Sequence, residues 1–378
     1  MDEILRLHKN GKIKIVSTVP INSTDVLRKV YTPGVAEVCQ MIVDKPALKN
    51  IYTGIPYTVA IVTDGTRILG LGNIGSVAGM PVMEGKAALL QELVGVNGIP
   101  ILMGTKDAEE IIRTVKNIAP TFGGIQLEDI ESPKCFTIFD RLEEELDIPV
   151  MHDDQQGTAV VILAGLINAG KMAKISLQEA KIGLIGLGAA GLATGKLLLR
   201  YTGRPVLGTA QSEASIQRHV VAGGIASNFD EIMRKADIVV ATSGVKGLIK
   251  PAMVRKGQII FALTNPAPEI EPEGARRAGA LIAVDGKEIN NVLGFPGLWR
   301  GTFDAQASKF TYEMYRAAAL ALAAATPEGK MVPDVFAPGV FLKVTHAVAQ
   351  AAMESGVAQR KLSADYFASK DVKKIPEE

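Results

Sequence analysis

Short apolar segments that alternate with amphipathic helical patterns are the feature that most restricts how this chain can fold. The four apolar segments of the first half lie at residues 58–63, 99–103, 124–127 and 149–152. Helical patterns fit between them at residues 84–93, 107–118 and 134–146. Strands that are apolar on both faces are typical of buried parallel sheets with helical crossovers. The first half therefore predicts an α/β unit.

The second half repeats this alternation with its own sheet. Its predicted strands lie at residues 181–185, 206–208, 237–241, 259–263 and 281–284. A helix is predicted at 190–201, and a helical tail from 304 to 355 is broken near 327–338. A chain of 378 residues suits two domains. We predict an N-terminal parallel-sheet domain at 1–158. The second domain, at 159–378, is expected to be of the Rossmann type and to carry the C-terminal helices.

A glycine-rich turn follows the first apolar segment of the second half. The stretch KIGLIGLGAAG places Gly186, Gly188 and Gly191 between a predicted strand and a helix. In that context the first glycine permits a tight turn, the second lets the backbone approach a pyrophosphate, and the third lets helix and strand pack closely. Ala189 and Ala190 begin the helix, whose N-terminal N–H groups favour phosphates. A turn that needs glycine only for packing is the alternative.

Two later strands of the second half should also face the bound dinucleotide. They end at Thr-Ser-Gly (242–244) and at Thr-Asn-Pro (264–266). Ligands of such sheets lie beyond the carboxyl ends of the strands. We therefore expect these two segments on the nicotinamide side.

Acidic residues follow three strands of the first half. One strand ends at Asp64 and leads to Arg67, and two others end in the acidic pairs 128–129 and 153–154. Because the carboxyl ends of parallel strands share one edge, these acids can converge. Carboxylates without histidine or thiolate partners suit Mg²⁺ or Mn²⁺. The alternative is that these acids are solvated and cap the helices that follow. If only one acidic pair were present, this alternative would be favoured.

Three further side chains are ambiguous when each is taken alone. Lys86 enters a predicted helix, and a nearby cation would disfavour its ammonium, which would make it a base. A surface lysine is the simpler interpretation. Tyr31 precedes a Thr-Pro-Gly turn that would hold its phenol rigidly. His152 flanks the acids, but a lone histidine is more often a structural residue.

Composition excludes several functional classes. The net charge of +1 and the absence of a basic run argue against nucleic acid as a partner. No apolar stretch reaches the roughly 20 residues that span a bilayer, so no membrane association is expected. Cys39 and Cys135 lie far apart in the sequence. They predict small buried side chains rather than a disulfide framework, and a cytoplasmic location.

At this point the chain resembles the malic enzyme family, in its short prokaryotic form. The resemblance covers most of the chain, and HDDQQGTA after an EDI strand is its most specific element. The matching stretches are VYTPGVA (30–36), DGTRILGLGNIG (64–75), MEGKAALL (83–90), QLEDI (126–130), HDDQQGTA (152–159), GLGAAG (186–191), LTNPAPEI (263–270) and INNVLGFPG (289–297).

The resemblance implies a role for each matching residue. Lys86 corresponds to the general base, which takes the proton from the malate hydroxyl. Tyr31 corresponds to the general acid, which protonates the enolpyruvate intermediate. Asp153 corresponds to a neighbouring acid that assists. Arg67 would bind a substrate carboxylate through its planar guanidinium.

The same resemblance implies ligands for the metal, the substrate and the cofactor. Glu128, Asp129 and Asp154 correspond to the metal ligands. The residues that correspond to contacts with substrate or nicotinamide are Asn265, Asn290 and Asn291. The implied fold is a substrate and metal domain followed by a Rossmann-type domain, and the family suggests a homodimer. Whether Tyr31 serves its own subunit or a partner remains open.

The implied activity is the oxidative decarboxylation of L-malate to pyruvate and CO₂, with reduction of NAD or NADP and a requirement for Mg²⁺ or Mn²⁺. A malolactic enzyme that keeps its NAD and releases lactate is an alternative of the same class. A catalytically silent dinucleotide sensor is an alternative of a different class. A 2-hydroxy-acid dehydrogenase without decarboxylation would normally use a histidine base, and none of the four histidines lies in a suitable motif.

The choice between NAD and NADP depends on the loop after the second strand of the dinucleotide sheet. NAD-specific sheets usually carry an acid about 20 residues after the first glycine. Here the strand leads to Ser212, and Glu213 is the first acid. Ser212 and Arg218 are candidates to contact a 2′-phosphate. The sequence therefore favours NADP or dual use, while NAD bound through backbone groups is the alternative.

Overall fold

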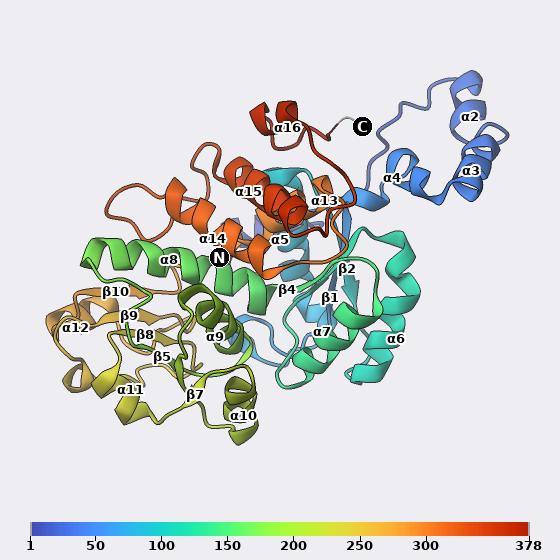
Figure 1. Ribbon diagram of the computed structural model, residues 1–378. Helices are drawn as coiled ribbons and strands as arrows, with labels where there is room; N and C mark the ends of the chain where they lie inside the picture. The colour runs from blue at the N-terminus through green and yellow to red at the C-terminus, as the bar shows by residue number, and fades with distance from the viewer. Residues whose placement is uncertain (1, 377–378) are drawn as a thin grey trace.

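Two parallel sheets, one in each half of the chain, form the framework of the structure (Figure 1). The computed structural model describes residues 2–376. The first sheet has the strand order β2-β1-β3-β4 and is parallel throughout. Its strands are β1 (Thr58–Thr63), β2 (Asn97–Leu102), β3 (Gly124–Leu127) and β4 (Val150–His152). The helices that connect them are α5 (Ser76–Val94), α6 (Ala108–Ile118) and α7 (Lys134–Glu145).

The second sheet has the strand order β10-β9-β8-β5-β6-β7 and is also parallel. Its strands are β5 (Ile182–Ile185), β6 (Leu207–Thr209), β7 (Ile225–Ala226), β8 (Ile238–Ala241), β9 (Ile259–Ala262) and β10 (Ile282–Asp285). Its helices are α9 (Ala189–Thr202), α10 (Glu213–Val221), α11 (Phe229–Lys235) and α12 (Pro272–Arg277). The strand order reverses between β5 and β8, and ligands of such sheets bind at this reversal.

One buried helix joins the two sheets. After β4 the chain makes a π-helical turn, η5 (Asp153–Gly157), and continues directly into α8 (Thr158–Ala173). Residues 159–170 are all buried, as expected for a helix that is apolar on every side. The polar exception is Asn168, whose amide donates to the carbonyls of Ala323 and Met331 at 3.3 and 2.9 Å.

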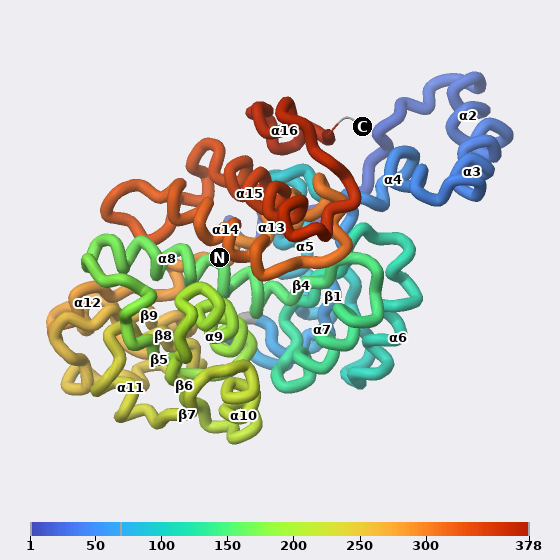
Figure 2. The backbone as a smooth tube through the Cα atoms, in the orientation of Figure 1, coloured from blue at the N-terminus to red at the C-terminus, as the bar shows by residue number. Residues whose placement is uncertain are grey.

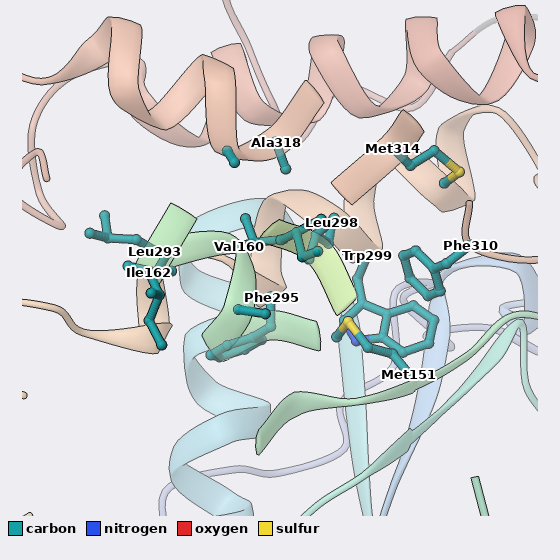
Figure 3. Packing of buried hydrophobic residues seen from close by; sticks show 14 of the residues in the cluster. Met151, Val160, Ile162, Leu293, Phe295, Leu298, Trp299, Phe310, Met314 and Ala318 are labelled. Carbon is teal, nitrogen blue, oxygen red and sulfur yellow. The ribbon is translucent and has the colours of Figure 1, made fainter. Parts of the chain in front are cut away.

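The C-terminal helices pack on both halves of the chain. They are α13 (Phe295–Asp304), α14 (Tyr312–Ala325), α15 (Val340–Glu354) and α16 (Ala364–Ala368). Helix α13 is buried along its whole length and contacts α5, while α14 contacts α8. Trp299 lies in this core beside Met151 and Phe310 (Figure 3). The predicted division at residues 158 and 159 stays a prediction, since these helices belong to neither sheet alone.

The N-terminal segment, residues 2–55, has no buried residue, unlike helices α13, α14 and α15. Helix α1 (Asp2–His8) is followed by Lys12, whose Nζ donates to the carbonyl of Pro81 in α5 at 2.6 Å. Residues 14–55, which we call the arm, then extend away from the sheets (Figure 2). The arm contains α2 (Thr24–Val30), α3 (Val35–Asp44), η1 (Pro46–Leu48) and α4 (Lys49–Tyr52). None of residues 2–55 is buried. The prediction of a buried Cys39 is therefore wrong, whereas Cys135 is buried.

The predicted fold class is confirmed, and the differences concern the bounds of elements and elements that were not predicted, among them α10, α11 and α12. Strands β1 and β3 have the predicted bounds. Helix α5 begins at Ser76 rather than at residue 84, although it contains Pro81, because its buried face packs on the first sheet. This places Lys86 in the middle of a helix rather than near its N-terminus. Within residues 2–376 no helix is long and apolar enough to cross a membrane.

Candidate active site

Three carboxylates meet at the carboxyl edge of the first sheet. Glu128 and Asp129 follow β3, and Asp154 lies in the η5 turn after β4. Oxygen atoms of the three side chains lie within 4.8 Å of one another. Glu128 and Asp129 are buried, and Asp154 is partly exposed. The structure thus brings together the three residues that the sequence predicted as metal ligands.

The surrounding structure fixes the orientation of these acids. Gln126, on β3, accepts a hydrogen bond from the Trp299 indole at 2.6 Å, and its amide donates to Glu128 at 2.8 Å. Asp129 adopts a left-handed backbone conformation with φ of 53°, which aspartate tolerates better than most residues. In this conformation its backbone N–H donates to Asp154 at 3.1 Å.

Asp64 does not join the carboxylate cluster, contrary to the expectation that the strand-end acids converge. Its buried carboxylate accepts a hydrogen bond from Lys134 at 2.5 Å and bonds from the backbone and hydroxyl of Thr66. The following Arg67 has an exposed side chain, and its backbone N–H donates to the carbonyl of Asp129 at 3.0 Å. Asp64 and Lys134 therefore hold the loop that carries Arg67 against the metal-ligand loop, a role that the sequence analysis missed.

Lys86 reaches the cluster from the middle of α5. Its Nζ lies 3.1 Å from Glu128, donates to Asp153, and lies 4.4 Å from the centre of the Phe295 ring. Burial lowers the pKa of Lys86, but the carboxylates of Asp153 and Glu128 outweigh burial, and the pKa is raised overall. Without a cation the lysine is therefore held as an ammonium.

Asp153 connects Lys86 to the second half of the chain. Its Oδ2 accepts from Lys86 and, at 2.8 Å, from the amide of Asn291. Burial raises the pKa of Asp153, while Lys86 lowers it in part. Asn290 instead caps η7 (Asn291–Leu293) by accepting from the N–H of Val292, so of the two asparagines it is Asn291 that bonds to Asp153. His152 is fully buried, and burial lowers its pKa, as expected for a structural histidine.

The electrostatics of the cluster fit a divalent cation. Burial raises the pKa of Glu128 well above its ordinary value; Lys86 opposes this, and Asp153, Asp154 and Asp129 raise it further. An all-oxygen ligand set of this kind suits Mg²⁺ or Mn²⁺. A cation held by Glu128, Asp129 and Asp154 would relieve their mutual repulsion.

The glycine-rich turn has the geometry of a dinucleotide site. Gly186 has a φ of +97°, and a Cβ at Gly191 would lie 1.9 Å from the carbonyl oxygen of Gly186. A Cβ at Gly188 would meet no atom within 4 Å. The first and third glycines are thus required by the fold. The second opens toward solvent at the N-terminus of α9, where a pyrophosphate can approach.

Loops that follow strands of the two sheets meet, which brings both halves to one site. A Cβ at Gly70, in the loop after β1, would lie 2.9 Å from Pro266, in the loop after β9. Asn265 lies in this second loop. Ser212 caps α10 by accepting from the N–H of Ser215. Arg218 lies over the Phe136 ring of α7, 5.2 Å from its centre, and so contacts the first half of the chain.

Tyr31 is the predicted residue that the structure leaves apart. It directly follows α2, which lies at the far end of the arm (Figure 1), and Tyr31 is 67% exposed. Within residues 2–376 no hydrogen bond joins its phenol to Lys86 or to the carboxylate cluster. The site within one chain therefore holds the predicted base and metal ligands without the predicted acid.

Comparisons of the sequence and of the structure with known proteins all find similarity to malic enzymes. The family model described as malic enzyme, N-terminal domain, matches residues 10–143. The NAD-dependent malic enzyme 1 of Bacillus subtilis (strain 168) is 57% identical over 93% of this chain and 79% of that protein. The bifunctional malic/malolactic enzyme of the same organism is 41% identical over 98% of this chain and 97% of that protein. The crystal structure of malic enzyme from Pyrococcus horikoshii Ot3 has a TM-score of 0.91 and 40% identity, and covers 97% of this chain and 93% of that chain.

Proposed function

Because the chain belongs to the malic enzyme family, we propose that it converts L-malate to pyruvate and CO₂ with reduction of a nicotinamide dinucleotide and with a divalent cation. One observation carries the proposal: Lys86 lies between Asp153 and the carboxylate cluster of Glu128, Asp129 and Asp154. A base beside a cation site, next to a dinucleotide turn, is the arrangement that the oxidation of a hydroxy acid requires.

We propose that Glu128, Asp129 and Asp154 hold Mg²⁺ or Mn²⁺. The bound cation would polarise the keto group of the β-keto acid, which favours loss of CO₂. Arg67, at the exposed edge of the same site, is suited to bind a substrate carboxylate through its planar guanidinium. Asn265 and Asn291 supply further amide donors from the second half of the chain.

We propose that Lys86 removes the hydroxyl proton of malate while the nicotinamide accepts the hydride from C2. For this step Lys86 must be neutral. The cation would offset the negative charge of Glu128, which otherwise keeps the ammonium form stable. Asp153 accepts a hydrogen bond from Lys86 and has a raised pKa because it is buried. Asp153 is therefore placed to take the proton of Lys86 once a cation offsets the charge of Glu128, which would leave the amine free to act as the base.

We propose that the enzyme works as a homodimer in which Tyr31 serves the site of the partner subunit. The arm has no buried residue and exposes large apolar side chains, among them Ile15, Val19 and Val43. A segment that cannot bury an apolar surface of its own gains stability by packing on another chain. A second copy that covers the arm would also bring the phenol of Tyr31 to a site that lacks it.

We propose NAD as the preferred cofactor, in place of the preference for NADP that the sequence suggested. Arg218 is engaged with Phe136, and Ser212 is engaged as a helix cap. Both candidate contacts to a 2′-phosphate therefore also have a structural role. The 57% identical relative is named as NAD-dependent, which supports the same choice.

Purified enzyme tests these proposals in one assay. Malate, Mn²⁺ and either NAD or NADP are supplied, the absorbance of the reduced nicotinamide is followed, and the acid product is identified. We expect reduced dinucleotide and pyruvate in equal amounts, with a higher kcat/KM for NAD. Lactate without net reduction of the dinucleotide would show the malolactic alternative. The 41% identical relative is named as a bifunctional malic/malolactic enzyme, which is why this outcome is tested. Dinucleotide binding without turnover would show a sensor.

A further inference from the structure

Glu269 is a buried carboxylate outside the cluster described above. Its side chain is completely inaccessible to solvent, and it makes no ion pair within residues 2–376. A buried charge without a cationic partner is costly unless hydrogen bonds compensate it. The residue therefore depends on the groups that donate to it.

Those donors come from the ends of two neighbouring strands. Oε1 of Glu269 accepts from the N–H of Ser243 at 2.7 Å, from its hydroxyl at 2.8 Å, and from the hydroxyl of Thr264 at 2.5 Å. Oε2 accepts from the N–H of Thr264 at 3.2 Å. The two hydroxyl oxygens in turn accept from Gly244 and Val245 N–H groups at 2.9 and 3.1 Å.

The chemistry of the carboxylate fixes the direction of these bonds. An ionised carboxylate can only accept hydrogen bonds. Both hydroxyl protons must therefore point at Glu269, which leaves each hydroxyl oxygen available for a backbone N–H. One side chain thus orders donors from residues 243–245, after β8, and from Thr264, after β9.

These two loops line the dinucleotide site. The hydroxyl of Thr242 donates to the carbonyl of Gly186 in the glycine-rich turn at 3.1 Å. The second loop carries Asn265 and meets the first half of the chain where Pro266 lies against Gly70. Glu269 is therefore the common anchor of the segments on the nicotinamide side.

We propose that Glu269 is a positioning residue that holds the 242–245 and 264–266 loops at the spacing that the nicotinamide half of the dinucleotide requires. This inference rests on the proposed dinucleotide site. Glu269 acts through the loops and does not touch the reacting atoms. Its removal should therefore weaken the oxidised and the reduced cofactor alike.

Gln258 provides a matched control in the same sheet. It is also completely buried and lies just before β9, at the opposite edge. Its amide donates to the carbonyls of Met233 and Ala236 at 2.7 and 2.9 Å, and its oxygen accepts from the N–H of Arg255 at 2.8 Å. Gln258→Ala removes a comparable buried anchor without touching the loops on the nicotinamide side.

The experiment measures the Kd for NADH by nicotinamide fluorescence, the Kd for NAD by competition, and the Tm. We expect all three variants, Glu269→Ala, Glu269→Gln and Gln258→Ala, to lower the Tm. Only the Glu269 variants should weaken both cofactors, by about tenfold for alanine, or roughly 1.4 kcal/mol. Glutamine should cost less, because its amide oxygen can still accept the bonds that Oε1 receives.

Several outcomes would overturn the proposal. A folded Glu269→Ala with an unchanged Kd would do so, as would an equal loss of affinity in Gln258→Ala or a loss restricted to NAD. If the Glu269 variants do not fold, Ser243→Ala and Thr264→Ala each remove one hydroxyl and should each raise the Kd for NADH. An unchanged Kd for NADH in both of these variants would then contradict the proposal. A wild-type protein that does not bind NADH would refute the dinucleotide site itself.

Discussion

At the scale of single residues, the chemistry of the site follows from how carboxylates share one lysine and one cation site. Asp153 and Glu128 both lie against Lys86, and the other two metal-ligand candidates, Asp129 and Asp154, lie beside Glu128. The protonation of each group therefore depends on its neighbours. Two predictions follow from this coupling, one for the base and one for the cation.

The first prediction concerns Lys86 as the base. Lys86→Ala should lower kcat for malate oxidation by about 10²- to 10⁴-fold, the usual contribution of a general base. Lys86→Arg should be as inactive, because a guanidinium keeps the charge but does not release its proton. The Kd for NADH should stay unchanged in both. Substantial turnover by the arginine variant would show that charge, rather than proton transfer, is the role of this position.

The second prediction concerns pH and the cation. Burial raises the pKa of Glu128 above its ordinary 4.5, so without metal the folded protein binds protons more tightly than the unfolded chain. Stability of the metal-free protein should therefore fall as the pH rises above that value. A cation replaces these protons, so the increase in Tm caused by Mn²⁺ should grow with pH. At a hundredfold excess over Kd the stabilisation is about 2.7 kcal/mol.

Asp154→Asn is the matching variant for this experiment. It keeps the shape of the side chain and removes one ligand charge, so the shift caused by Mn²⁺ should shrink at every pH. A shift in the wild type that does not vary with pH would contradict competition between protons and metal. An unchanged shift in the variant would remove Asp154 from the ligand set.

The sequence predicted part of this chemistry and missed part of it. Glu128, Asp129 and Asp154 could be found because each follows a recognisable apolar strand, and parallel strands share an edge. Asp64 satisfied the same rule, but Lys134, at the start of α7 and distant in the sequence, pairs with it and makes it a structural anchor. Glu269 follows no strand directly, and its role depends on contacts that only the folded chain creates.

At the scale of elements, continuous apolar segments determined which predictions were correct. The bounds of β1 and β3 followed from such segments. Helix α5 was predicted too short, because Gly79 and Pro81 disfavour a helix locally, while packing on the sheet outweighs this preference. The two-residue strand β7 is too short to show a periodicity, and α13 begins with Phe-Pro-Gly, which disfavours a helix locally.

The turn between β5 and α9 gives the third prediction, in which two glycines should respond differently. Gly191→Ala places a Cβ 1.9 Å from a backbone oxygen and should lower the Tm markedly. Gly188→Ala meets no atom within 4 Å, so the Tm should hold while the Kd for NADH rises at least about tenfold, or roughly 1.4 kcal/mol. Equal behaviour of the two variants in both measurements would contradict the assignment of separate roles to the two positions.

At the scale of the whole molecule, the position of the arm determines which groups one chain can bring together. The C-terminal helices tie the two sheets to each other, so base, metal ligands and dinucleotide turn lie in one body. Tyr31 lies outside it, between α2 and α3, whose residues are all at least partly exposed. The fourth prediction tests whether a second chain completes the site.

Co-expression of Tyr31→Ala and Lys86→Ala should restore activity that neither variant has alone. In a symmetric dimer that exchanges Tyr31, each mixed pair has one intact site. Random pairing then gives about one quarter of wild-type activity, whereas a tyrosine that serves its own chain gives none. The measurement is kcat per chain in the mixture, with tagged copies to confirm that mixed dimers form. Wild-type behaviour of Tyr31→Ala alone would remove this residue from catalysis.

Because the arm has no buried residue, the specific activity of the enzyme should depend on the concentration of the chain. If Tyr31 reaches its place only when two chains meet, the number of complete sites depends on the square of the free-chain concentration. Specific activity would then fall on dilution through the dissociation constant of the dimer, although every chain stayed folded. A change in the amount of this chain in the cell would then change the flux through the reaction by more than a proportional factor.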